Sequence, residues 1–256
     1  MKPFIPAVRF EMADPADEAG LFYSFMEDGY WADGLAKFYP EARSIQVPGA
    51  DRESCLIKYK DTFEKVRAAR KDMIDIARKE FVEKWGSLRD DFLHALSAHF
   101  ETEWPREKPE IIGKITVIPI YPRFLAGFSF FVGYKSAGDM IETSAHEIVH
   151  FLWFKKWREV FPDIDAKEYE SPHLVWRLSE VIDPIILQCH PVISSLIKPK
   201  HWGYSSFEKV QIEGVPMVEY FKKIYLDSVA AHDSFEMTMR KLWTEAQKHE
   251  RELRSF

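Results

Sequence analysis

The stretch Ser144–Phe154 reads Ser-Ala-His-Glu-Ile-Val-His-Phe-Leu-Trp-Phe and contains the pattern His-Glu-x-x-His. Residues four apart lie on the same face of a helix, so His146 and His150 would point the same way and could bind one metal ion from consecutive turns. Glu147, the next residue, could reach a water molecule on that metal and take its proton. Two imidazoles with a neighbouring carboxylate are typical of a zinc-dependent hydrolase.

A catalytic zinc site takes three protein ligands and a water molecule, so a third ligand is expected. The longer pattern His-Glu-x-x-His-x-x-Gly-x-x-His would supply it locally, but Trp153 and Lys156 occupy the Gly and His positions. Glu180 fits best, because its neighbours are apolar and a carboxylate in a buried helix needs a cation. An exposed Glu180, or one paired with Arg177, is the alternative. Weaker ligand candidates lie in or beside a loop: Glu168, Glu170 and His173.

The motif His146-Glu147-x-x-His150 followed by Glu180 on a separate helix resembles the gluzincin group of zinc metallopeptidases, the thermolysin-like superfamily. The resemblance covers about residues 111–190. It implies an α/β fold with two lobes and a cleft, a zinc ion held by the two histidines and Glu180, and Glu147 as general base. The family often places an Asp one turn after its third ligand to orient a zinc histidine. Here that acid is Asp183, three residues on.

The same resemblance implies a hydrogen-bond donor for the oxyanion that forms during peptide hydrolysis, usually a Tyr or a His. Tyr169 and His173 are predicted to be catalytic in this way, and His201 and Tyr204 are further candidates. The resemblance also predicts that a peptide or protein substrate lies extended along the strand at 128–134, adding itself to the sheet.

The hydrophobic pattern predicts an α+β fold that is mostly helical, with a small sheet before the metal-binding helix and extra N- and C-terminal helices. In the first half we expect an edge strand at 4–12, a helix at 17–38 broken near Gly29 and Gly34, and helices at 61–85 and 88–100 separated by Gly86. In the middle of the chain we expect strands at 111–121 and 128–134, the metal-binding helix at 139–157 and a loop at 163–172. The last part should contain a helix at 173–188 that kinks or restarts at Pro184, an irregular stretch at 190–212, and closing helices at 215–228 and 230–254.

Composition narrows the class of protein. The chain has 256 residues, 46% of them hydrophobic, with 35 basic against 41 acidic residues. This balance argues against a nucleic-acid or anionic-membrane surface, and no apolar run approaches the roughly 18 residues of a membrane span. The start lacks the apolar region of a signal peptide, and Cys55 and Cys189 read as buried thiols in a reducing compartment. We expect a cytoplasmic protein forming a single two-lobed domain over 1–256, with a helical part at 1–105, the zincin-like core at 106–190 and a helical part at 191–256.

A function of another class fits part of the pattern. The chain carries 8 Trp and 20 Phe, and long helices flank the motif. A helical binding or scaffold protein, with a zinc site that is structural or inactive, would have the same features. Zinc content and peptide hydrolysis, measured together, discriminate between the two.

Overall fold

The computed structural model describes residues 3–29, 31–201, 203–204 and 206–255. It is mostly helical with a small mixed sheet, which confirms the predicted α+β class. The chain divides into two compact units that are described separately below. The sheet unit comprises Ala7–Ser87 and Glu110–Ser144, and the helical unit comprises the residues up to Pro6, Leu88–Pro109 and the chain from Ala145 onward.

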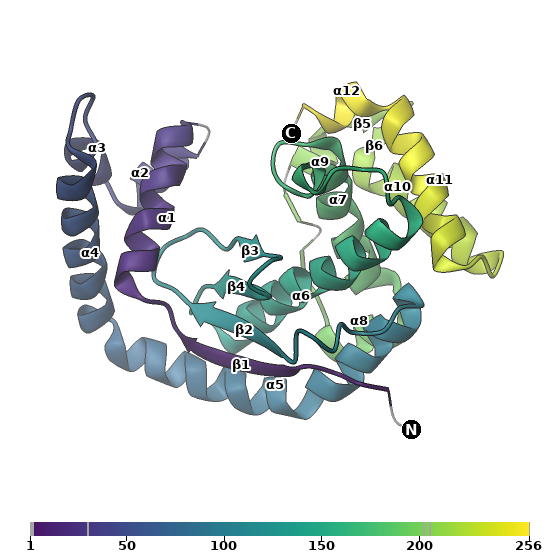
Figure 1. Cartoon of the computed structure of the whole chain (residues 1–256), viewed down its shortest axis with the longest axis horizontal. Coiled ribbons are helices and arrows are strands. Elements are labelled where there is room, and N and C mark those ends of the chain that lie inside the picture. The colour runs from purple at the N-terminus through teal and green to yellow at the C-terminus, as the bar shows by residue number, and fades with distance from the viewer. Residues whose placement is uncertain (1–2, 30, 202, 205, 256) are drawn as a thin grey trace. The chain divides into compact units, whose positions relative to one another are not determined.

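The sheet unit contains four strands in the order β1-β2-β4-β3 (Figure 1). Strands β1 (Ala7–Met12), β2 (Glu110–Ile115) and β4 (Ser129–Val132) are parallel, and β3 (Arg123–Phe124) runs antiparallel to β4. The helices of this unit are α1 (Pro15–Asp28), α2 (Ala32–Phe38), α3 (Ala42–Ile45), α4 (Arg52–Ala69) and the first half of α5 (Lys71–Phe100). The edge strand predicted at 4–12 is confirmed over Ala7–Met12, because among the described strands β1 is the end of the sheet and pairs with β2.

The position of β4 contradicts one prediction. β4 lies between β2 and β3 and pairs with both of them, so its two edges are occupied. The prediction that a substrate pairs with the strand at 128–134 is therefore wrong for Ser129–Phe131, since an added strand needs unpaired N–H and C=O groups.

A buried aromatic cluster holds the sheet against α5. The ring of Phe10 on β1 lies 4.4 Å from the ring of Phe81 and 6.1 Å from that of Phe130, measured between centroids. Phe10 is paired in register with Gly113 on β2, and a Cβ atom at Gly113 would lie only 2.3 Å from the Phe10 ring. The glycine is therefore required by the close approach of this ring.

The second predicted strand is shorter than expected. β2 ends at Ile115, whereas strand structure was predicted up to Tyr121. The carboxylate of Glu18 on α1 is fully buried and accepts hydrogen bonds from Thr116 Oγ1 at 2.6 Å and from the Val117 amide at 3.0 Å. The Val117 amide therefore bonds to a side chain instead of a neighbouring strand, and Pro119 has no amide to donate.

The helical unit is built mainly of helices, and it contains the end of α5 from Leu88 and the part of α6 (Ala137–Val160) from Ala145 onward. The elements that follow are the 3₁₀ turn η1 (Ala166–Tyr169), α7 (Leu174–Cys189), α8 (Pro191–Ile197), α9 (Ser206–Lys209), α10 (Met217–Ala230), α11 (Phe235–Lys248) and α12 (Glu250–Leu253). A two-residue hairpin, β5 (Gln211–Ile212) with β6 (Val215–Pro216), precedes α10. Trp153 and Trp157 of α6 are fully buried and contact Phe235 and Trp243 of α11.

Several predicted breaks are absent or displaced. α5 runs through Gly86 without interruption, because buried residues at helical spacing continue on both sides of it. Gly34 lies inside α2, whereas the break at Gly29 is confirmed, with a backbone φ of 78°. α7 does not restart at Pro184, and the stretch at 190–212, predicted to be irregular, contains two short helices and a strand.

No single helix in the described ranges is long and apolar enough to cross a membrane. Within these ranges, the segments Ala166–Cys189 and Pro191–Ile197 have the length and composition of a membrane span only when they are taken together, across a bend of 86°.

Candidate metal site

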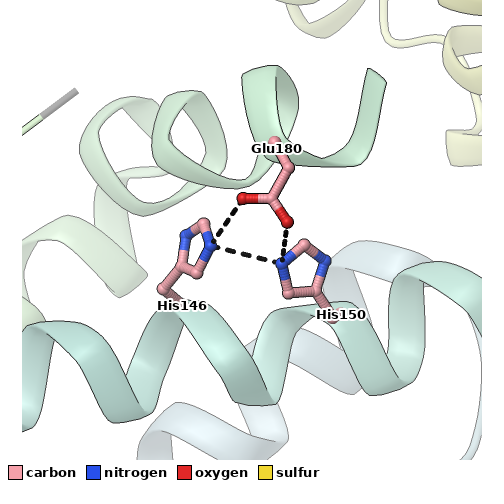
Figure 2. Close-up of side chains that lie close together, drawn as sticks. All are labelled: His146, His150 and Glu180. Carbon is pink, nitrogen blue, oxygen red and sulfur yellow. Dashed lines mark hydrogen bonds and ion pairs between the residues drawn. The ribbon is translucent and has the colours of Figure 1, made fainter. Parts of the chain in front are cut away.

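Helix α6 presents the two histidines of the motif on one face. The residues around them that face the protein interior, Ala145, Ile148, Val149 and Leu152, have no measurable exposure. This apolar packing fixes the rotation of α6, so that the histidines, which are four residues apart, point in the same direction. The Nε2 atoms of His146 and His150 lie 3.2 Å apart (Figure 2).

Helix α7 brings Glu180 opposite this pair. One carboxylate oxygen lies 3.4 Å from His146 Nε2, and the other lies 3.3 Å from His150 Nε2 (Figure 2). Zinc bonds to imidazole nitrogen and carboxylate oxygen are about 2.0–2.2 Å long, so ligand atoms of a tetrahedral site lie roughly 3.3–3.5 Å from one another. Each of the three separations is close to this length, but two of them involve different Glu180 oxygens. With one ligand atom from each residue, the set lies within 4.8 Å. The residues present therefore fit a zinc ion bound by His146, His150 and Glu180.

The electrostatics of this cluster favour a cation. Glu180 is 5% exposed and His150 is fully buried. Burial alone would raise the pKa of Glu180, but the two imidazoles outweigh it and hold that pKa well below its usual value. Burial lowers the pKa of His146, yet Glu180, Glu147 and Asp183 together raise it to about 9. A proton or a metal ion at this point would thus be stabilised by surrounding negative charge.

Asp183 lies one turn beyond Glu180 on α7 and contacts the second histidine. Its Oδ2 is 2.7 Å from His150 Nδ1, which is an ion-pair distance without the alignment of a regular hydrogen bond. Both residues are fully buried. A carboxylate next to the far nitrogen of a metal-binding imidazole selects the tautomer whose Nε2 lone pair faces the metal.

Glu147 follows His146 directly and is 7% exposed. On a helix it is turned by about 100° from His146, beside the direction in which the ligands point. Its charge contributes to the raised pKa of His146, second only to Glu180 among the groups that raise it. The role of Glu147 as a base next to a metal-bound water stays a prediction.

The predicted oxyanion donors Tyr169 and His173 have different neighbours from each other. Tyr169 is 2% exposed, and its ring packs 4.8 Å from Phe154, whose ring in turn stacks at 5.8 Å on His150. His173 is the residue before α7, and its Nδ1 lies 3.4 Å from a Glu168 oxygen. His173 precedes Glu180 by seven residues, about 10 Å along the helix axis, so a role as metal ligand would require a large rearrangement.

The remaining candidates also lie outside the three-residue cluster. Glu168 faces His173, and Glu170 is exposed. His201 is exposed, with its backbone oxygen accepting from Gln188, and the Tyr204 ring packs on Phe207. The sequence analysis did not predict that Phe154 stacks on His150. The one feature of the sequence that indicates this contact is the spacing of four residues on one helix.

Comparison with known proteins adds no relative. No protein-family model matches this sequence, and no match was found among curated proteins or solved structures.

Proposed function

We propose that this chain is a zinc-dependent hydrolase, a metallopeptidase of gluzincin type with a zincin-like core. The observation that carries the proposal is the cluster of His146, His150 and Glu180. The two Nε2 atoms lie 3.2 Å apart, and each faces a different Glu180 oxygen, at 3.4 Å and 3.3 Å. Three protein ligands leave a fourth tetrahedral position open, which is the arrangement of catalytic rather than closed structural zinc sites.

The proposed chemistry assigns a role to each side chain. A zinc ion held here would supply a bound water of lowered pKa and would polarise the scissile carbonyl. Glu147 takes the proton of the attacking water and returns it to the leaving amine, as a general base and then a general acid. Asp183 is a positioning residue that keeps the His150 ring in its metal-binding orientation.

Metal analysis of the purified protein tests the ligand set. We expect close to one zinc per chain in the wild type and in Glu219→Gln, an exposed glutamate of α10 paired with Lys222 that serves as matched control. Glu180→Gln removes an anionic ligand and should lose the zinc. Retention of zinc by Glu180→Gln would contradict the ligand assignment.

Hydrolysis tests the catalytic assignment separately. Glu147→Gln should keep its zinc and cut a quenched-fluorescent peptide library at least about 100-fold more slowly than wild type, the usual contribution of a general base. If the wild type holds one zinc and cuts no member of the library, the site is structural or inactive and the binding or scaffold function is favoured.

A further inference from the structure

An open groove lies between the last turns of α5 and helix α8, within the helical unit. Its volume is about 530 Å³, which is in the range of small-molecule sites. The lining residues of α5 recur every three or four positions, as on one face of a helix. The apolar lining residues are Ala95, Ala98, Val192 and Leu196. Val192 is 51% exposed, so this wall of the groove is open to solvent. None of the three proposed metal ligands lines the groove.

Two contacting imidazoles form the polar part of this lining. His99 on α5 and His190, between α7 and α8, have ring centroids 4.7 Å apart. Burial lowers the pKa of both, that of His99 to about 3, so both rings are neutral near pH 7. A neutral imidazole carries one proton on one of its two nitrogens, and the hydrogen bond at the other nitrogen decides which.

The hydrogen bonds of the two rings determine where these protons lie. The Ile193 amide donates to His190 Nδ1 at 3.3 Å, so the His190 proton is on Nε2. The Tyr225 hydroxyl is 3.3 Å from His99 Nε2, and the tyrosine is 1% exposed. Because a buried hydroxyl needs an acceptor for its proton, Tyr225 donates to Nε2, and the His99 proton is on Nδ1. Each ring therefore keeps an N–H donor that forms no hydrogen bond within the part of the chain that the structure describes.

The charges around the groove restrict the class of ligand. Two N–H donors disfavour a cation, whereas Asp91, which is exposed and lines the same groove, disfavours an anion. An anion would also favour protonated imidazoles, which burial opposes. The remaining lining residue, His94, is half-buried and lies one turn beyond Asp91 on α5. An uncharged oxygen acceptor, such as that of an amide, a ketone or an alcohol, matches both donors without adding a charge.

We propose that this groove binds a small neutral amphipathic molecule. Its oxygen accepts hydrogen bonds from His99 Nδ1 and His190 Nε2, and its apolar body packs on Val192 and Leu196. This inference does not depend on the proposed function, because no metal ligand takes part in the site.

NMR of the imidazole nitrogens in the full-length protein tests the two donors. The nitrogen-15 shifts at pH 7 should show His99 protonated at Nδ1 and His190 at Nε2, and the opposite tautomer in both rings would overturn the proposal. The probes are three molecules of one shape: cyclohexanecarboxamide, cyclohexanecarboxylate and cyclohexylmethylammonium. The amide should shift both N–H signals with a dissociation constant of about 1 mM, and the two ions should bind at least about tenfold more weakly. No binding of the amide, or tighter binding of either ion, would overturn the assigned ligand class.

Substitutions locate the bound amide. Ala95→Met fills the groove and should abolish binding, whereas Ala230→Met, at an exposed position of α10, should leave it unchanged. His190→Asn can still accept from the Ile193 amide but loses the Nε2 donor, and should weaken the amide about 3- to 10-fold. Glu180→Gln should bind the amide like the wild type. Unchanged affinity in Ala95→Met, or loss of binding in Glu180→Gln with native thermal unfolding, would show that the amide binds elsewhere and would overturn the site.

Discussion

His150 is the most constrained residue of the candidate site, and its constraint comes from Asp183. The imidazole is fully buried between Glu180 on one ring nitrogen and Asp183 on the other, with Phe154 stacked on its face. Each neighbour restricts the imidazole ring. The two carboxylates determine its tautomer, and the phenylalanine ring restricts its tilt. A ligand held in this way needs little reorganisation when a metal ion binds.

Replacement of Asp183 by Asn should therefore weaken zinc binding without removing a ligand. The amide keeps the shape of the carboxylate but no longer favours the required tautomer through its charge. We expect a loss of about 10- to 100-fold in zinc affinity, measured by competition with a chromophoric chelator. Asp227→Asn, an exposed change on α10, is the control. An unchanged affinity for Asp183→Asn would show that the contact with His150 has no positioning role.

At the scale of secondary-structure elements, two glycines should respond in opposite ways to replacement by alanine. Gly113 on β2 faces the Phe10 ring, whereas a Cβ added at Gly86 on α5 would meet no atom within 4 Å. Gly113→Ala should lower the free energy of unfolding by about 1–3 kcal/mol through overpacking. Gly86→Ala should raise it by up to about 1 kcal/mol through helix propensity. Urea denaturation measures both, and a neutral Gly113→Ala would contradict the close packing of Phe10.

The half-buried histidine of α5, His99, predicts how the helical unit responds to acid. His99 contacts His190, Tyr225 and Phe235, which belong to other segments of this unit. Burial, with a smaller contribution from His190, lowers the pKa of His99 to about 3. The unfolded chain, in which a histidine has a pKa near 6.5, then binds more protons than the folded one between about pH 6.5 and 3. The folded state should lose stability as the pH falls through this window.

The size of this acid effect is measurable by substitution. His99 contributes at most about 1.4 kcal/mol per pH unit, since one proton is involved. His99→Gln keeps an acceptor for the Tyr225 hydroxyl but has no proton to gain, so its unfolding free energy should fall less steeply below pH 6.5. His94→Gln, on the same helix, should keep the wild-type slope. Equal slopes in all three proteins would show that His99 is not the group responsible.

Local pattern predicted the helices better than the sheet. The apolar periodicity of α6 and α7 extends over several turns, and each signal is local in the chain. Strand β2 ended early because Glu18, nearly 100 residues away, accepts the hydrogen bond of the Val117 amide. The order of the strands, which covers both edges of β4, also depends on long-range pairing. Such tertiary contacts cannot be recognised from the residues at the position whose structure they change.

The candidate site was predictable to the extent that it follows from helix geometry and from charge. His146 and His150 needed only the spacing of four residues, and Glu180 needed only its position as an acid within an apolar helix. Tyr169 and His173 were chosen by residue type in a loop, where no periodicity restricts position. The structure brings Tyr169 to Phe154 and His173 to Glu168.

For the molecule as a whole, the site joins two helices that are separate in sequence. His146 and His150 lie on α6 and Glu180 on α7, and the residues around all three are core residues of the helical unit. In the metal-free protein, the raised pKa of His146 favours a proton on this imidazole beside the buried Glu180. A bound zinc ion would replace that proton and link the helices directly, so metal binding is expected to stabilise the folded unit as a whole.

This coupling predicts a zinc-dependent stability. A ligand that binds only the folded state adds about 2.7 kcal/mol to the free energy of unfolding at a free concentration 100 times its dissociation constant. Thermal unfolding of the wild type should therefore shift upward with buffered zinc and downward with a chelator. Glu180→Gln should lose this dependence, whereas Glu147→Gln should keep it, because Glu147 is assigned to proton transfer and not to the metal. A zinc response of the same size in Glu180→Gln would show that the stabilising ion binds elsewhere in the chain.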